Sequence, residues 1–217
     1  MPGLPEPAKK VAERVWAMGA EPQDEWARAF RQEVREQHPR FLTAVRADAQ
    51  MLARLRGDRW QTSGGAGAAF QVLRLIVVGD SFFAQVCYRA KAALQRRRVP
   101  IVPRLFHRLA IITGQICIGD PAILEPGVHI PHGQVVVDTR CRIGTGVTLS
   151  PFTTIGRIAG KAGGPTLGSM VTVGTGAKVL GPITVGRGAV IGANAVVLED
   201  VPDGAVVVGV PARIVSK

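Results

Sequence analysis

The side chains best suited to move protons near neutral pH are the four histidines of this chain, His38, His107, His129 and His132. An imidazole with a pKa near ~6.5 can take a proton from an attacking group and return it to a leaving group. His129 and His132 stand three residues apart around Pro131, in a stretch whose proline and glycine predict a turn. A catalytic base and an ordinary exposed turn histidine are both compatible with this position.

The elements that would position these histidines change type near residue 112. Up to that point apolar residues recur three and four positions apart, which predicts α-helices. The series that carry this spacing are Val11, Val15 and Met18, then Phe41, Val45, Ala49 and Leu52, then Phe70, Leu73 and Val77. After Thr113 the helical spacing disappears, and glycines and β-branched residues dominate.

In the second half an aliphatic residue recurs at every sixth position. The series are Ile118, Leu124 and Ile130, then Val137, Ile143, Leu149 and Ile155, then Leu167, Val173, Val179, Val185, Ile191 and Val197. A helix repeats at 3.6 residues and a simple strand at 2, so a period of six indicates short flat strands joined by tight corners. Three hexapeptides form one triangular coil, and stacked coils bury the aliphatic ladder.

Two interruptions of the ladder mark places where function is expected, because the regular wall of a solenoid offers little chemistry. Between Ile130 and Val137 the step is seven residues, and the extra residue falls in the stretch that contains His132. Between Ile155 and Leu167 the register survives, but Lys161 stands where an aliphatic residue is due. We predict that this second segment is a loop that leaves the coil.

The formal net charge of +11 is unevenly distributed. Residues 1–110 hold 19 Lys and Arg against 10 Asp and Glu, whereas residues 111–217 hold 8 against 6. The basic residues are densest at Arg96–Arg98, followed by Arg104, His107 and Arg108. No aromatic stacking residues or binding motif accompany them, so a solvated helix end or a subunit contact is expected and nucleic acid is not.

No membrane partner is expected. The longest apolar stretch, 66–78, is interrupted by Gln71 and Arg74 and is shorter than the ~20 residues that span a bilayer. The first residues, from Met1 to Glu6, lack the pattern of a signal peptide, so a cytoplasmic location is predicted. The three cysteines show no metal-binding or disulfide spacing and are expected to be free thiols; they are Cys87, Cys117 and Cys141.

From Tyr88 to Val215 the chain resembles the serine acetyltransferases and their hexapeptide-repeat acyltransferase relatives. The segments that carry the resemblance are Asp120-Pro121-Ala122, Gly127 to Val137, Val173 to Gly181, and Gly209-Val210-Pro211-Ala212-Arg213-Ile214. The resemblance implies an α+β chain, with an α-helical region over residues 1–112 and a left-handed parallel β-helix over residues 113–217. It also implies a homotrimer or a dimer of trimers, because the family's active site lies in the groove between neighbouring β-helices.

The resemblance assigns roles to particular residues. His132 matches the family's general base, and backbone N–H groups of the adjoining turn are expected to stabilise an oxyanion. His129, next to the inward Ile130, is expected to line the site or a subunit contact. Acetyl-CoA, or another acyl-CoA, is the implied co-substrate, held along the later coils, and no metal is expected. The residues predicted to hold it are Lys161, Gly174, Lys178, Gly192 and Arg213.

Several positions depart from the family pattern. Pro131 stands where serine acetyltransferases have an Asp that helps to hold the substrate ammonium. Residues 163–166 lack the Arg-His pair whose Arg engages the substrate carboxylate. The carboxylate that orients the catalytic histidine would fall near Ile118, so Asp120 is the predicted replacement, with Asp138 behind it. The chain also ends at Lys217, soon after the last motif, without the long tail that docks onto a partner sulfhydrylase.

We therefore predict an acyl-CoA-dependent acyltransferase that acts on a hydroxyl or amine of a small-molecule acceptor. The alternative is serine O-acetylation itself, in cysteine biosynthesis. A zinc-dependent carbonic anhydrase can also use a β-helix, but it needs three histidines around the metal, and only two lie in the repeat region. A scaffold that only trimerises is the remaining alternative.

Overall fold

The computed structural model describes residues 34–58, 60, 65–161 and 163–216. The predicted helical series at Val11, Val15 and Met18 lies outside these residues. The helices are α3 (Phe41–Leu55), α4 (Ala66–Val78), α5 (Phe82–Arg96) and α6 (Val102–Gly114). The strands are β1 (Ile116–Ile118), β2 (Ala122–Leu124), β3 (Val135–Asp138), β4 (Cys141–Ile143), β5 (Thr148–Leu149), β6 (Thr154–Gly156), β7 (Thr166–Leu167), β8 (Thr172–Val173), β9 (Lys178–Leu180), β10 (Thr184–Val185), β11 (Val190–Ile191), β12 (Val196–Val197), β13 (Val206–Val208) and β14 (Arg213–Ser216).

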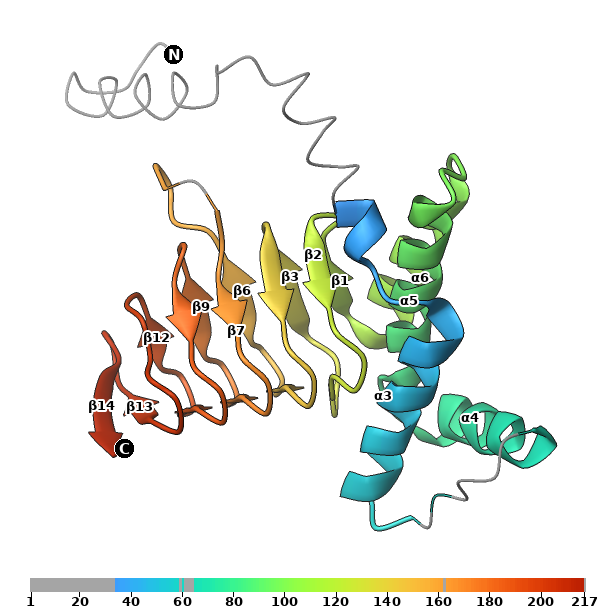
Figure 1. Cartoon of the computed structure of the whole chain (residues 1–217), viewed down its shortest axis with the longest axis horizontal. Helices are drawn as coiled ribbons and strands as arrows, with labels where there is room; N and C mark the ends of the chain where they lie inside the picture. The colour runs from blue at the N-terminus through green and yellow to red at the C-terminus, as the bar shows by residue number, and fades with distance from the viewer. Residues whose placement is uncertain (1–33, 59, 61–64, 162, 217) are drawn as a thin grey trace.

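The strands wind into a parallel, left-handed β-helix with three flat walls (Figure 1). We name the walls by their strand order: wall A is β1-β3-β6-β9-β12, wall B is β2-β4-β7-β10, and wall C is β5-β8-β11-β13-β14. Neighbouring strands are parallel in every wall except at the end of wall C, where β14 runs antiparallel to β13. The helices gather at the opposite end of the stack, beside the first coil. The predicted fold class is confirmed.

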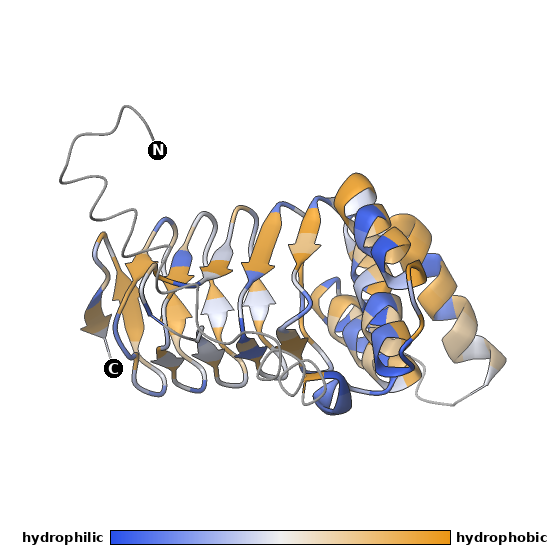
Figure 2. Cartoon of the chain, turned by 90° about the horizontal axis from the view of Figure 1, so that it is seen from above, coloured by the Kyte–Doolittle hydropathy of each residue, from blue (hydrophilic) through white to orange (hydrophobic). Residues whose placement is uncertain are grey.

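The predicted ladder forms the core of the β-helix. All thirteen of its aliphatic residues are buried, with exposed fractions between 0 and 3%. They stack in register, so that Ile118, Val137, Ile155, Val179 and Val197 are successive partners in wall A. Apolar colour accordingly runs along the strands of the coils in Figure 2. Burial of this continuous column is the main stabilising term of the β-helix.

Both interruptions of the ladder are visible in the strand register. A regular coil has 18 residues, as between Val137 and Ile155. The first coil has 19 residues, from Ile118 to Val137, and the extra one lies in the turn with His132. The step from Ile155 to Val179 is 24 residues, so one hexapeptide is looped out of the coil between β6 and β7. The predicted excursion is therefore confirmed.

The edge of the prism that carries His132 repeats a single corner conformation. The corner that joins wall C to wall A has a residue with positive φ in four successive coils: Gln134 (62°), Phe152 (62°), Gly176 (75°) and Asn194 (57°). We call this corner the C–A edge. The turn that carries His132 is its first member, because it lies between the His129 bridge to Thr148 and strand β3.

Helix α5 covers the open end of the β-helix. The backbone carbonyls of the first coil have no further coil to bond, and polar side chains along one side of α5 donate to them. The donors and the carbonyls they reach are Ser81 to Ile130, Gln85 to Val128 (2.8 Å), Tyr88 to Ala122 (3.1 Å), Arg89 to Leu124 (2.5 Å) and Glu125 (2.8 Å), and Lys91 to Ile118 (2.6 Å). Each bond satisfies an acceptor that would otherwise be buried without a partner.

A buried ion pair ties α3 to this arrangement. Arg89 donates to both carboxylate oxygens of Asp48, at 2.8 and 3.0 Å, and both side chains are almost fully buried. Asp48 also accepts from the backbone N–H of Gly127 at 2.8 Å. The pair therefore joins α3, α5 and the first coil, and every charged atom in it has hydrogen-bond partners.

Helix α4 is present as predicted, but its series Phe70, Leu73 and Val77 faces outward, with exposed fractions of 60 to 78%. Leu75 packs against α3 and α5 instead, and Val72 and Ile76 are partly buried against the same cluster. Among the described residues no single helix is long and apolar enough to cross a membrane. In that part of the chain only α4 and α5 taken together reach that length, and they are bent by 117°. The change from helix to strand falls at Gln115, between α6 and β1.

Removing the carboxylate of Asp48 should strongly destabilise the protein. We expect Asp48→Ala to lower the free energy of unfolding by about 3–5 kcal/mol, because Arg89 is left buried without its counter-ion. Urea unfolding followed by circular dichroism measures this change. Asp58→Ala is the matched control: Asp58 meets Arg56 (3.6 Å) and Arg74 (3.3 Å) nearer the surface, so its loss should cost no more than about 1 kcal/mol. Equal losses would contradict the role of the buried pair.

Candidate functional site

The turn that carries His132 is held between two helices. On one side, Ser81 at the start of α5 donates its hydroxyl to the carbonyl of Ile130, just before the turn. On the other side, Gly133 lies so close to Gly114, the last residue of α6, that a Cβ at Gly133 would overlap the Gly114 carbonyl. Only glycine fits at that position. The helices therefore fix the position of the turn.

His132 has a carboxylate partner that comes from the helical region. Its Nδ1 lies 2.9 Å from Oδ2 of Asp80, in the short connection between α4 and α5. Because an ionised carboxylate only accepts hydrogen bonds, this contact places the proton on Nδ1 and leaves the lone pair on Nε2. Both side chains are well exposed, at 64% and 70%, so Nε2 is accessible to a reactant.

His129 has a different environment. It is 8% exposed, and neither ring nitrogen has a hydrogen-bond partner among the described residues. Burial, followed by the nearby charge of His132, lowers the pKa of His129 to about 4. The ring is therefore neutral at pH 7, and its buried nitrogens cannot reach solvent or a reactant. The prediction that His129 lines the site is not supported by this burial.

Asp120 is not the carboxylate beside His132. It forms an ion pair with Lys91, whose Nζ lies 3.0 Å from Oδ1, at the other end of α5. Asp138, the second candidate, is the last residue of β3 and lies against Gly119. The expectation that Asp120 orients His132 is therefore corrected: Asp80 does so in the structure. Asp120 is close in sequence to Ile118, where the orienting carboxylate was expected. In the folded chain, however, it contacts Lys91 in the C-terminal part of α5, away from His132.

Two of the predicted CoA-binding residues lie on the same edge as His132. Gly174 follows β8 and Gly192 follows β11, so both occupy the C–A edge in successive later coils. Both glycines also have a packing reason. A Cβ at Gly174 would stand 2.7 Å from the backbone N of Ala193, and one at Gly192 would stand 2.7 Å from Val208. The close stacking of coils requires glycine here whether or not a ligand binds.

Lys178 and Arg213 flank that edge on the later coils. Lys178, in β9, donates to the carbonyls of Phe152 (2.7 Å) and Gly176 (2.9 Å), so its ammonium ties two corners of the C–A edge together. Arg213, at the start of β14, is exposed and lies 3.7 Å from Glu199. Its guanidinium retains donors for a phosphate.

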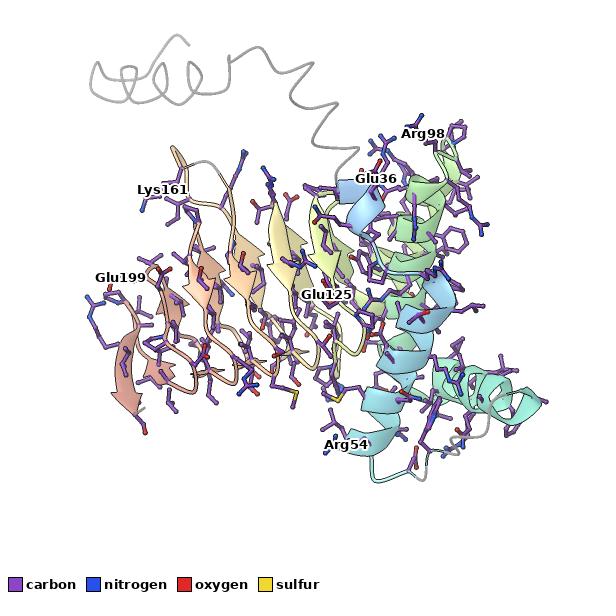
Figure 3. The ribbon with its side chains drawn as sticks, in the orientation of Figure 1. Glu36, Arg54, Arg98, Glu125, Lys161 and Glu199 are labelled. Carbon is purple, nitrogen blue, oxygen red and sulfur yellow. The ribbon has the colours of Figure 1, made fainter. Side chains whose placement is uncertain are left out.

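Lys161 does not share this edge. It lies on the looped-out hexapeptide between β6 of wall A and β7 of wall B, and Figure 3 shows it projecting from the stack. The sequence predicted the loop correctly, but the loop leaves the coil at the corner between walls A and B. A role for Lys161 in CoA binding stays a prediction.

Within the described ranges, no three His, Cys, Asp or Glu side chains gather closely enough to hold a metal ion. The cysteines Cys87, Cys117 and Cys141 are free.

Sequence reasoning missed Asp80 and Ser81. Their only visible signal is an Asp-Ser pair ahead of an apolar helical series, which normally indicates a helix N-terminus. No local pattern reveals that this N-terminus meets the turn with His132, because the two are about fifty residues apart in sequence.

Comparison with known proteins agrees with this architecture. The family model described as "Bacterial transferase hexapeptide (six repeats)" matches residues 164–199. A serine acetyltransferase of Synechococcus elongatus is 39% identical over 155 residues, which cover 68% of this chain and 62% of the relative. The chain therefore spans less than two thirds of the length of that relative.

Solved structures give the same result. The soybean serine acetyltransferase apoenzyme has a TM-score of 0.66 and 28% identity, covering 83% of this chain and 71% of its own. A serine acetyltransferase solved in complex with CoA has a TM-score of 0.66 and 26% identity, covering 84% of this chain and 72% of its own.

The repeat, the coil register and these matches define a hexapeptide-repeat protein of the left-handed β-helix class. Within that class the chain is similar to the serine acetyltransferases, and the resemblance seen in the sequence motifs is confirmed.

The buried His129 should make stability depend on pH. Its folded-state pKa of about 4 lies below the usual 6.5, so the stabilisation is complete above pH 6.5 and is lost as the pH falls toward 4. Between pH 6.5 and pH 5 the free energy of unfolding of the wild type should fall. In His129→Leu, which has no imidazole to protonate at this position, the fall should be smaller by about 1–2 kcal/mol. Urea unfolding at several pH values measures this difference. His132→Leu is the exposed control, and an unchanged pH dependence in His129→Leu would refute the assignment.

Proposed function

We propose that this chain is an acyl-CoA-dependent acyltransferase that uses His132 as its general base. The acyl group is acetyl in the first instance, and the acceptor is a hydroxyl or amine of a small molecule. The observation that carries the proposal is the position of His132: it stands on the C–A edge with Nδ1 bound to Asp80, and the predicted CoA-contacting glycines continue the same edge. The CoA complex of a structural relative supports a CoA site on this fold.

The chemistry follows from the orientation of the imidazole. With its proton on Nδ1 and directed at Asp80, His132 can accept the acceptor's proton at Nε2 while the acceptor attacks the thioester carbonyl. When the tetrahedral intermediate collapses, the same Nε2–H returns the proton to the departing thiolate. Asp80 stabilises the imidazolium that exists between these steps, and it does not itself take up the proton.

The donor site is proposed to lie along the C–A edge of the later coils. A pantetheine arm can form hydrogen bonds with the backbone of the corners at Gly174 and Gly192, and Arg213 is placed for a phosphate.

We also propose that chains associate as trimers, which would turn the exposed edge into a groove between neighbours. Sedimentation equilibrium at the mass of one 23.0 kDa chain would contradict this assembly. The cytoplasmic location stays a prediction.

Serine is the second candidate for the acceptor, and the name of the Synechococcus relative favours it. Few charged residues near His132 could bind the ammonium and carboxylate groups of serine. Pro131 precedes His132, and Gly164 and Pro165 lie where the family has its Arg-His pair. An acceptor without a zwitterionic head group fits these residues better. Thiol release from acetyl-CoA with and without L-serine separates the two: robust turnover on serine would establish serine O-acetylation and reject an acceptor other than free serine.

Replacing His132 should abolish most of the activity without affecting the fold. We expect His132→Ala to reduce kcat by about 10²–10⁴-fold, the usual contribution of a general base. The KM for acetyl-CoA should change little, because His132 is not among the residues proposed to hold the donor. Thiol release from acetyl-CoA measures both constants, and circular dichroism checks the fold. Unchanged kcat would refute the proposed reaction at this site.

Replacing the partner carboxylate should give a smaller loss of the same kind. We expect Asp80→Asn to lower kcat by about ten- to a hundredfold at constant KM for acetyl-CoA, because His132 loses its tautomer and orientation while the exposed pair remains partly solvated. Asp120→Asn is the matched variant, with the same chemical change at the other end of α5, and it should stay within about twofold of the wild type. If Asp120→Asn caused the larger loss, Asp120 would be the orienting residue after all.

A further inference from the structure

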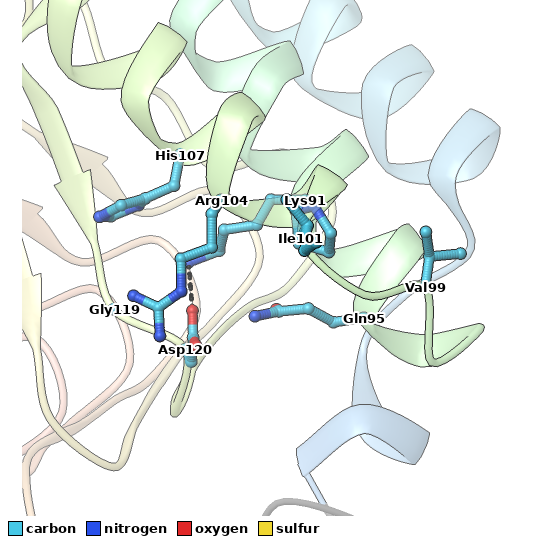
Figure 4. A pocket seen from close by; sticks show the side chains of 9 residues that line it. Lys91, Gln95, Val99, Ile101, Arg104, His107, Gly119 and Asp120 are labelled. Carbon is cyan, nitrogen blue, oxygen red and sulfur yellow. Dashed lines mark hydrogen bonds and ion pairs between the residues drawn. The ribbon is translucent and has the colours of Figure 1, made fainter.

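A second polar site lies at the far end of α5, between α5, α6 and the first coil (Figure 4). It is a cavity of about 360 Å³, which falls in the size range of small-molecule pockets. Its lining residues are Lys91, Gln95, Val99, Ile101, Pro103, Arg104, His107, Gly119 and Asp120. Lys91 is nine residues beyond the first residue of α5, which is ~14 Å along a helix axis, so this cavity is separate from the turn with His132.

A buried lysine forms the wall of the cavity. Lys91 is 2% exposed, and its Nζ donates to the carbonyl of Ile118 at 2.6 Å and to Asp120 at 3.0 Å. Burial lowers the pKa of Lys91, and the charge of Asp120 opposes that shift. An ammonium group has three N–H donors, so one remains after these two bonds.

A second cation faces the same space without a hydrogen-bond partner. Arg104 is exposed in the first turn of α6, and in the described part of the chain its guanidinium makes no hydrogen bond or ion pair. Figure 4 shows Arg104, Lys91 and Asp120 converging. His107, one turn further along α6, has a pKa lowered by burial and then by Lys91, so it adds a neutral N–H donor.

The cavity therefore holds two cations against one carboxylate. Asp120 forms an ion pair with Lys91 and also attracts Arg104, so the three side chains together carry one net positive charge. A guanidinium binds a carboxylate or phosphate through two parallel N–H bonds, and this geometry suits an anionic ligand. Part of the lining is apolar, formed by Val99, Ile101 and Pro103. This part can cover a short carbon skeleton.

We propose that this cavity is a binding site for a small anionic metabolite, held through its carboxylate or phosphate group by Arg104 and by the free N–H of Lys91. The site is independent of the proposed acyl transfer, because its residues do not touch the turn that carries His132. The two sites are nevertheless connected by one rigid element: α5 begins beside His132 and carries Lys91 and Gln95 near its other end.

Calorimetric titration of the full-length protein with inorganic phosphate and, separately, with succinate tests the proposal and distinguishes the two anion types. Arg104→Gln should weaken binding of the preferred probe by about tenfold or more, the effect of one charge-assisted hydrogen-bond pair. Asp120→Asn should tighten it by about tenfold, because a competing negative charge beside the ligand is removed. Arg108→Gln removes the same charge from the same helix outside the cavity and should leave affinity within about twofold.

Arg104 is exposed, so Arg104→Gln should not impair folding. Asp120→Asn leaves the buried Lys91 without its counter-ion, although the amide oxygen can still accept from Nζ, so some loss of stability is expected for this variant. Circular dichroism and urea unfolding check that both variants are folded under the titration conditions.

Weaker binding in Arg104→Gln together with tighter binding in Asp120→Asn would identify the cavity as the binding site. If the anion were attracted only by the general positive charge of the surface, Arg104→Gln and Arg108→Gln would weaken binding equally. Equal affinities in all four proteins would show an adventitious ion only. That result, or no binding of either probe at millimolar concentration, would overturn the proposal.

Discussion

A parallel β-helix must be closed at the end where its first coil presents carbonyls with no strand beyond them. Unpaired backbone acceptors at a sheet edge destabilise the fold when they are buried, and they can pair with strands of other molecules when they are exposed. In this protein α5 resolves the problem with side chains: Ser81, Gln85, Tyr88, Arg89 and Lys91 donate to successive carbonyls of the first coil. The position of α5 is therefore set by at least five points of contact, and everything attached to its ends is placed with it.

Both polar sites of the molecule depend on this closure. The N-terminal end of α5 carries Asp80 to the turn with His132, and its C-terminal part carries Lys91 to Asp120. The buried pair of Arg89 and Asp48 lies between them and prevents α5 from sliding along the coil, because a shift would leave a desolvated charge unpaired. The helical region thus supplies a side chain to the candidate active site as well as covering the solenoid.

The β-helix was predictable from sequence because its signal is periodic and local. Every ladder residue that the period of six identified is buried, and both departures from the period correspond to real changes in coil length. The helices were also predictable, but not their buried faces: Phe70, Leu73 and Val77 are exposed on α4. The polar side of α5 was overlooked, although Gln85 and Arg89 at a spacing of four, amid apolar residues, mark a helix face that must meet acceptors. The contact of Asp80 with His132 has no local signal, since it depends on how two distant segments dock.

The antiparallel strand β14 has a consequence for how copies of this chain can meet. A solenoid whose last parallel strand were bare could accept the first coil of another molecule and grow end to end into a fibril. Here β14 turns back along β13, so the outermost strand of wall C runs antiparallel to the strands before it. At that end of wall C the chain thus supplies its own covering strand, while α5 covers the first coil at the other end of the stack. Growth of wall C by a parallel strand paired to β13 would therefore first require β14 to be displaced.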